Sequence, residues 1–371
     1  MRPNAAVRVA TATLTALVLA ACSTTAGTAP SATPPASPAG AAVAEPVPSG
    51  SLDCDDVVPA EVVAAALQGS AAAPAAPVRA TQDSAALEAV LLEGVGGLAC
   101  SWRVGAGMPE SAAPGDWAYL RIAVLPGAAD DWVPLATYGP DPSPDVRRIG
   151  DVDASFEAGD LGWTYSAPAG DDWVLVELRA AGLAADGGRY DGVGADRVIE
   201  SLDAAALAAF TAIAAAGEDH VIESGAGAGD GRPECRGGLA PQGLASAAEA
   251  TVDDVVVSRP TAPATSFAEA VALRAGVFTC TVSTGTGFDD RVTTARGFDA
   301  LVDRFAAPDA DVAFSPIEMA DVPADHPVSA WLEDHVDKAG RSAVLAVPGS
   351  LYWIEGPHAE AVARAIVAQT W

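Results

Sequence analysis

The stretch Leu87-Glu-Ala-Val-Leu-Leu-Glu-Gly-Val-Gly-Gly-Leu-Ala-Cys100 has a counterpart later in the chain, Phe267-Ala-Glu-Ala-Val-Ala-Leu-Arg-Ala-Gly-Val-Phe-Thr-Cys280. Each stretch begins with an apolar segment, continues with a glycine turn and ends in a predicted strand that carries the cysteine. At this length the apolar segment fits either a helix or a strand, and the sequence leaves both open. Because the same order occurs twice, the two stretches indicate an internal repeat.

A further cysteine precedes each stretch at nearly the same spacing, Cys54 in the first copy and Cys235 in the second. Each is followed by a proline, Pro59 or Pro241, that opens a short Ala-rich segment. Proline fits the first turn of a helix, where its missing N–H loses no hydrogen bond, so both segments are predicted to be helices.

Two disulfides are expected from the cysteine count. Of the 5 cysteines, Cys22 lies near the amino terminus and the other four form an even set. In an oxidising compartment such a set is typical of disulfides, and four cysteines allow three pairings. The repeat favours Cys54–Cys100 and Cys235–Cys280. Closing a loop of this size contributes on the order of 4 kcal/mol in the chain-entropy model.

The remaining pattern mixes helices with short strands without strict alternation, which predicts an α+β fold. We expect two tandem related domains, 52–217 and 234–371, each an antiparallel sheet packed with helices and tied by one disulfide. Strands are predicted at 118–125, 163–167, 173–178, 343–347 and 351–355, the last two joined by the turn Pro348-Gly-Ser350, and helices at 128–136, 196–216, 298–306 and 358–369.

A glycine-rich segment separates the two copies. Its alternate glycines, between Glu223 and Pro233, resemble a dinucleotide-binding loop. That loop requires a strand before it and a helix directly after it, whereas a predicted helix precedes this segment and Cys235 follows it. We therefore expect 218–233 to be a flexible linker.

The amino terminus predicts export. A basic start is followed by an apolar run of about thirteen residues. This run is shorter than the roughly twenty residues that a membrane-spanning helix needs. Residues 1–21 are therefore predicted to be a secretory signal peptide. Its last residues, Leu19-Ala-Ala-Cys22, resemble the lipobox of bacterial lipoproteins, which implies lipid attachment at Cys22. The alternative is an ordinary signal peptide cut near Ala21, with a free cysteine beside the cut.

The segment 22–51 is rich in Ala, Thr, Ser, Pro and Gly. It has too little apolar surface to offset the entropy of ordering, so we expect a disordered tether between the lipidated cysteine and the folded part. The whole chain has 20 basic and 49 acidic residues and a net charge of −29, which repels phosphate backbones and argues against a nucleic-acid partner.

The first copy resembles a family of actinobacterial secreted lipoproteins of unknown function. The resemblance depends on the lipobox, the Ser/Pro/Thr tether, an early cysteine with a short helix, and the later Cys100-Ser-Trp102 strand. The stretch Gly150-Asp-Val-Asp-Ala154 before a strand pair also fits. The second copy departs from the pattern, because Cys280-Thr-Val282 lacks the tryptophan. The resemblance implies an envelope-associated domain and brings no catalytic residues.

Histidines and acidic residues give two candidate sites. None of the 4 histidines has a zinc-binding spacing. The best local cluster of such residues comprises His326, Trp331, Glu333, Asp334 and His335. It could hold a metal or an acid–base pair, although the sequence favours an exposed acidic helix here. Three groups of acidic residues could bind calcium weakly: Asp53 with Asp55 and Asp56, Asp289 with Asp290, and Asp309 with Asp311. None has the spacing of an EF-hand loop, so solvated loops are the favoured interpretation.

No nucleophile elbow, Ser-x-x-Lys motif or Walker loop is present in the sequence. We therefore expect no catalytic, cofactor-binding or metal-binding residues. The default ligand site is a pocket between sheet and helix that is lined by some of the 8 tryptophans. The predicted function is a non-catalytic binding or adaptor protein, anchored in the bilayer through acylated Cys22 on the extracytoplasmic face of the cell membrane. Its partner would be an envelope protein or a small apolar ligand. The alternative is an envelope hydrolase with a site of scattered carboxylates and histidines.

Overall fold

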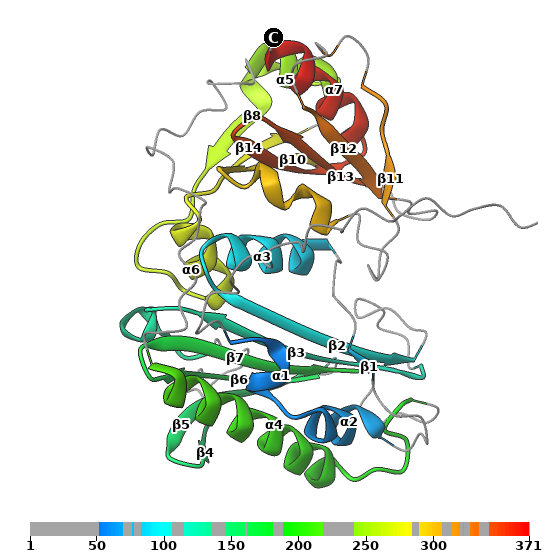
Figure 1. Ribbon diagram of the computed structural model, residues 1–371. Helices are drawn as coiled ribbons and strands as arrows, with labels where there is room; N and C mark the ends of the chain where they lie inside the picture. The colour runs from blue at the N-terminus through cyan, green and yellow to red at the C-terminus, as the bar shows by residue number, and fades with distance from the viewer. Residues whose placement is uncertain are drawn as a thin grey trace, which may run out of the picture. The chain divides into compact units, whose positions relative to one another are not determined.

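The computed structural model contains two antiparallel sheets, each of seven strands (Figure 1). It describes residues 52–69, 76–77, 83–105, 115–135, 145–159, 162–180, 188–217, 241–283, 289–305, 314–319, 322, 327–333 and 341–370. Sheet A has the order β1-β2-β3-β7-β6-β5-β4. Its strands are β1 (Ala76–Pro77), β2 (Leu98–Gly105), β3 (Trp117–Leu125), β4 (Asp145–Ile149), β5 (Val152–Gly159), β6 (Gly162–Ala169) and β7 (Asp172–Arg179).

Sheet B repeats this order strand for strand when it is read from its own first strand: β8-β9-β10-β14-β13-β12-β11. Its strands are β8 (Val255–Ser258), β9 (Phe278–Ser283), β10 (Asp289–Arg296), β11 (Phe314–Pro316), β12 (Ser329–Glu333), β13 (Arg341–Val347) and β14 (Ser350–Gly356). The predicted hairpin at Pro348-Gly-Ser350 is confirmed as the connection between β13 and β14.

One face of each sheet is covered by helices from the same half of the chain. Sheet A packs against α1 (Cys54–Val57), α2 (Ala60–Gln68) and α4 (Ala195–Ala216), and sheet B against α5 (Pro241–Ala247) and α7 (Ala359–Thr370). Within the described residues, α4 alone is long and apolar enough to span a membrane. Its buried residues belong instead to the hydrophobic core over sheet A, as expected for an amphipathic core helix.

The second face of each sheet contributes to a shared hydrophobic cluster, which we call the central core. It also includes α3 (Asp83–Gly94), α6 (Phe267–Arg274) and the 3₁₀ helix η4 (Asp299–Arg304). Phe267 of α6 packs edge-on against Trp173 of sheet A, with the ring centroids 5.5 Å apart. Gly94 of α3 lies so close to Phe298 that a Cβ there would come within 2.0 Å of the ring. Residues Pro48–Trp371 thus form one compact unit.

The predicted disulfide between Cys54 and Cys100 is confirmed, with the two Cα atoms 5.5 Å apart. It joins the start of α1 to β2. Cys280 is also disulfide-bonded, while Cys235 lies outside the described residues, as do Cys22, the segment 1–51 and the predicted linker 218–233.

The structure resolves one open assignment and corrects two local predictions. The two ambiguous apolar segments are helices, α3 and α6. The helix predicted at 128–136 is wrong, because only Ala129–Asp131 forms a helical turn, of the 3₁₀ type (η1). Pro134 follows shortly after and cannot donate the backbone hydrogen bond that a longer helix needs. The helix predicted at 298–306 is the shorter η4, which is likewise of the 3₁₀ type.

Candidate functional site

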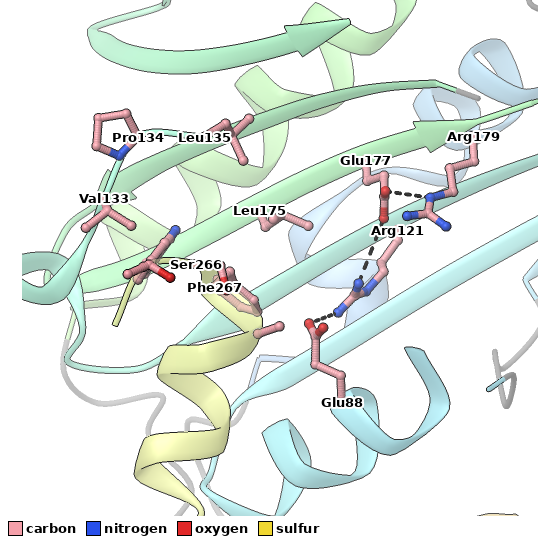
Figure 2. Close-up of a pocket in the computed structure, with 13 residues that line it drawn as sticks. Glu88, Arg121, Val133, Pro134, Leu135, Leu175, Glu177, Arg179, Ser266 and Phe267 are labelled. Carbon is pink, nitrogen blue, oxygen red and sulfur yellow. Dashed lines mark hydrogen bonds and ion pairs between the residues drawn. The ribbon is translucent and has the colours of Figure 1, made fainter. Parts of the chain in front are cut away.

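A pocket of about 220 Å³ lies on the central-core face of sheet A, against α3 and α6; we call it the central pocket (Figure 2). Five parts of the chain line it: α3, strands β3 and β7, the loop after η1, and the start of α6. The lining residues are Glu88, Arg121, Val133, Pro134, Leu135, Trp173, Leu175, Glu177, Arg179, Thr265, Ser266, Phe267 and Ala268.

Strand β7 gives the pocket its length. Successive side chains of a strand point to opposite faces, so Trp173, Leu175, Glu177 and Arg179 line the same face in a row. From the first to the last of these residues the strand rises about 20 Å. The row is apolar at the Trp173 end and charged at the Arg179 end, so the pocket is an elongated groove with two chemically different ends.

The charged end is centred on Arg121 of β3 (Figure 2). Its guanidinium donates a hydrogen bond to the Glu88 carboxylate of α3, and it also lies 3.8 Å from a carboxylate oxygen of Glu177. The other oxygen of Glu177 accepts a hydrogen bond of 2.6 Å from Nε of Arg179. The two arginines and two glutamates therefore alternate and balance in charge.

Burial alone would lower the pKa of Arg121, because it penalises the charged guanidinium. The negative charge of Glu88 opposes this, together with Tyr119 and Glu177, and the net result is a raised pKa. Arg121 is therefore a permanent cation with little exposure to solvent. Arg179 differs, because its side chain is 41% exposed and only its Nε bonds to Glu177 among the described residues. Its outer nitrogens can therefore bind a ligand anion.

The apolar end of the groove is closed by the loop after η1 and by the start of α6. Leu135 is partly exposed, and its backbone N–H donates to the Ser155 hydroxyl over 3.0 Å, which holds the loop against sheet A. At the start of α6, Ser266 accepts the N–H of Glu269 as the N-cap. The Glu269 carboxylate accepts bonds from the Thr265 hydroxyl and N–H, and these bonds lower its pKa.

A second cavity of about 430 Å³ lies on the other side of α3 and α6, where it also contacts β9 and β10 of sheet B. Glu88 and Ala268 line both cavities. Sheet B contributes three hydroxyls to this cavity. Those of Thr279 and Thr293 are hydrogen-bonded over 3.0 Å, and that of Ser258, at the end of β8, donates to the Thr279 carbonyl over 3.4 Å.

The predicted histidine cluster is only partly described. His326, His335 and Asp334 lie outside the described residues. Trp331 and Glu333 belong to strand β12, and Glu333 is buried, so the favoured interpretation of this stretch as an exposed acidic helix is wrong there. Among the residues that the structure describes, no group of three or more His, Cys, Asp or Glu side chains could hold a metal ion.

The acidic groups weighed as calcium ligands have other roles where they are described. Asp53 caps α1 and forms a reciprocal capping box with Asp56. Asp289 is exposed, but Asp290 is fully buried, so its interpretation as a solvated loop residue is wrong. Asp309 and Asp311 lie outside the described residues.

Asp290 instead holds the start of α7. Its carboxylate accepts the backbone N–H of His358 over 2.9 Å and contacts the ring Nδ1 of His358 over 2.8 Å. The close approach requires glycine at position 356, where a Cβ would come 2.3 Å from the Asp290 carboxylate. Neither Asp290 nor His358 lines the two cavities described above.

Asp290→Ala is expected to lower the free energy of unfolding by about 1–3 kcal/mol, because it removes the acceptor of the backbone N–H of His358 and the partner of its ring, both of which are partly buried. Urea denaturation followed by circular dichroism measures this loss. The matched control is Asp289→Ala, at the exposed neighbouring position, with an expected change within about 0.5 kcal/mol. Equal losses in the two variants would contradict the role assigned to Asp290.

The charged residues of the groove were missed by the sequence analysis, although a signal for them exists. Arg121 is the only charged residue of β3, and Glu177 follows four apolar residues of β7; both strands are buried on both faces along almost their whole length. A charge in such a strand needs a partner, so each predicts a buried ion pair. The groove confirms that Trp173 lines a pocket between sheet and helix, as expected for a tryptophan.

Taken together, the fold and the site define an α+β protein with two antiparallel sheets and an amphipathic groove at its central core. No family model, curated protein or solved structure matches the chain.

Proposed function

We propose that the protein is a non-catalytic binding lipoprotein of the cell envelope, and that its central pocket binds a small linear amphiphile. Acylated Cys22 would hold it on the extracytoplasmic face of the membrane, with the segment 22–51 as a tether. The observation that carries the binding function is the groove along β7, which runs from Trp173 to Arg179 and changes from apolar to charged.

The two ends of the groove match the two parts of such a ligand. Ligand pockets are mainly apolar, with a few polar groups that fix orientation. An alkyl chain would contact Leu135, Trp173 and Leu175, and an anionic head would meet the outer nitrogens of Arg179. Arg121 is already neutralised by Glu88 and Glu177, so we assign it to positioning Glu177 and, through it, Arg179.

The groove offers little support for the alternative function, an envelope hydrolase. The lining residues of the central pocket include the hydroxyls of Thr265 and Ser266 but no histidine or cysteine. Ser266 and Thr265 are occupied in capping α6. The Asp290–His358 pair would be a candidate acid–base group, but it lies outside the lining of both cavities.

We also propose that the two halves are tandem copies of one unit. The identical strand order supports this, and so does one pair of side chains. In sheet A, Arg121 lies opposite Glu177, and in sheet B, Arg291 lies opposite Glu355. Each arginine immediately precedes the residue paired with the disulfide-bonded cysteine of its sheet, Cys100 or Cys280.

Titration calorimetry with decanoate, a linear amphiphile with an anionic head, tests the binding function. We expect saturable binding to the full chain and weaker binding of decanol, which lacks the charge. Leu135→Trp would fill the groove and is expected to weaken decanoate binding at least tenfold, or about 1.4 kcal/mol. The control Leu207→Trp makes the same change at an exposed position of α4 and should leave binding unchanged. Absence of saturable decanoate binding, or equal affinity in the two variants, would rule out this assignment.

A further inference from the structure

The second cavity, of about 430 Å³, is larger than the central pocket and has the size of a small-molecule site. Helices α3 and α6 line it mainly with apolar side chains, among them Leu87, Leu91 and Ala272. Sheet B lines it with hydroxyls. The cavity therefore has an apolar side and a hydrogen-bonding side.

The three hydroxyls form a row across neighbouring strands. Ser258 of β8 lies opposite Thr279 of β9, and Thr279 lies opposite Thr293 of β10. Neighbouring strands are about 4.8 Å apart, so the row extends over about 10 Å. It is long enough to contact a small ligand at more than one point.

The described residues use only part of the hydrogen-bonding capacity of this row. A hydroxyl has one donor and two acceptor lone pairs. Thr279 and Thr293 share a single hydrogen bond, and Ser258 donates to the Thr279 carbonyl. Within the described residues, one threonine O–H and most of the lone pairs are therefore available, and both threonines are only partly buried. A ligand group that both donates and accepts, as a hydroxyl does, would use this capacity fully.

The strand order does not require these hydroxyls. Thr279 and Ala99 each directly precede the disulfide-bonded cysteine of their sheet. On the next strand, Thr293 lies opposite Thr279, and Ala123 lies opposite Ala99. Sheet A thus has two alanines of the central core where sheet B has two threonines. The hydroxyl row is a feature of the cavity and not of the shared architecture.

The charges around the cavity favour a neutral ligand. Its charged lining residues are Glu88, Glu269 and Arg259, and each already has a partner within the chain. Glu88 accepts from Arg121, and Glu269 accepts from Thr265. None of the three needs a counter-ion from a ligand, and the excess of carboxylates repels an anion.

We propose that the second cavity is a binding site for a small neutral molecule rich in hydroxyls, such as a sugar of one or two rings. The ligand hydroxyls would bond to the row on sheet B, and the C–H face of the ring would pack against Leu87 and Leu91. This ligand differs in chemistry from the anionic amphiphile that we assign to the central pocket.

Saturation-transfer NMR on the full chain tests the proposal, because it detects ligands that bind weakly. The probes are glucose, maltose, trehalose and sorbitol, each titrated separately, and at least one is expected to bind saturably. Thr279→Val and Thr293→Val each replace a hydroxyl with a methyl group of similar shape. Each should weaken binding of that probe about fivefold, the effect of one lost hydrogen bond.

Thr281→Val is the matched control. Thr281 is partly buried on the same face of β9, two residues after Thr279, but it does not line the cavity, so its variant should bind the probe as the unaltered chain does. Decanoate binding should also be unchanged in Thr279→Val, because Thr279 lies outside the central pocket.

Three outcomes would overturn the second site. The first is saturable binding by none of the four probes. The second is an equal effect of Thr279→Val and Thr281→Val. The third is an equal loss of sugar and decanoate affinity in Thr279→Val, which would mean that both ligands occupy one site. Failure of decanoate alone to bind the unaltered chain would contradict only the function proposed for the central pocket.

Discussion

Replacing Arg121 with methionine is expected to lower the free energy of unfolding by about 3–5 kcal/mol, as when one partner of a buried ion pair is removed. Methionine can fill much of the space of the arginine stem, so the loss comes from the charge. The carboxylates of Glu88 and Glu177 would remain at the charged end of the groove without their shared cation. The triple variant Glu88→Gln, Arg121→Met, Glu177→Gln removes these charges and should recover most of the loss. Urea denaturation at neutral pH measures all of these changes.

A surface arginine with the same number of carboxylate partners provides the control. Arg148 pairs with Asp151 over 3.4 Å and with Asp153 over 3.0 Å, but its side chain is 58% exposed. Water and salt weaken such pairs, so Arg148→Met should cost less than about 1 kcal/mol. If Arg121→Met and Arg148→Met were equally destabilising, the charged end of the groove would have no structural importance.

Local structure was predictable where the pattern of side chains is strong. Strand β7, helix α4 and the hairpin of β13 and β14 follow directly from alternation, composition and turn chemistry. Strands β4 and β10 escaped prediction, because their many charged and polar residues hide the apolar face. Their positions are determined by pairing with neighbouring strands, which a local pattern does not contain.

The groove required information of a different kind. Its charged end brings together Glu88 from α3, Arg121 from β3 and Glu177 from β7. Sequence reasoning can say that a charge within a buried strand needs a partner. The partners of Arg121 are determined by tertiary structure, because the pairing of β3 with β7 places Glu177 opposite it and the packing of α3 on the sheet brings Glu88 to it. The central core presents the same problem, because the contact of Phe267 with Trp173 joins residues from the two halves of the chain. A repeat predicts two similar units without predicting which faces they share.

Breaking the disulfide between Cys54 and Cys100 is expected to lower the free energy of unfolding by about 4 kcal/mol in the chain-entropy model. The bond closes a loop with a sequence separation of 46 and attaches α1 to the buried Cys100 of β2. Cys54→Ala and Cys100→Ala should each cause the whole loss, since either one removes the bond. Their double variant should therefore be no less stable than the single variants, within about 0.5 kcal/mol.

This non-additivity distinguishes the bond from ordinary packing. Cys100 is fully buried and Cys54 only partly, so packing losses alone would differ between the single variants and add in the double variant. Urea denaturation of the single and double variants distinguishes loss of a covalent link from loss of packing. The free thiol of each single variant is alkylated, because alkylation prevents its mispairing. Additive losses would contradict a covalent link. With the link intact, the start of α1 is held covalently to β2, so a force applied to the chain before Cys54 would be transmitted to sheet A without first unfolding α1 and α2.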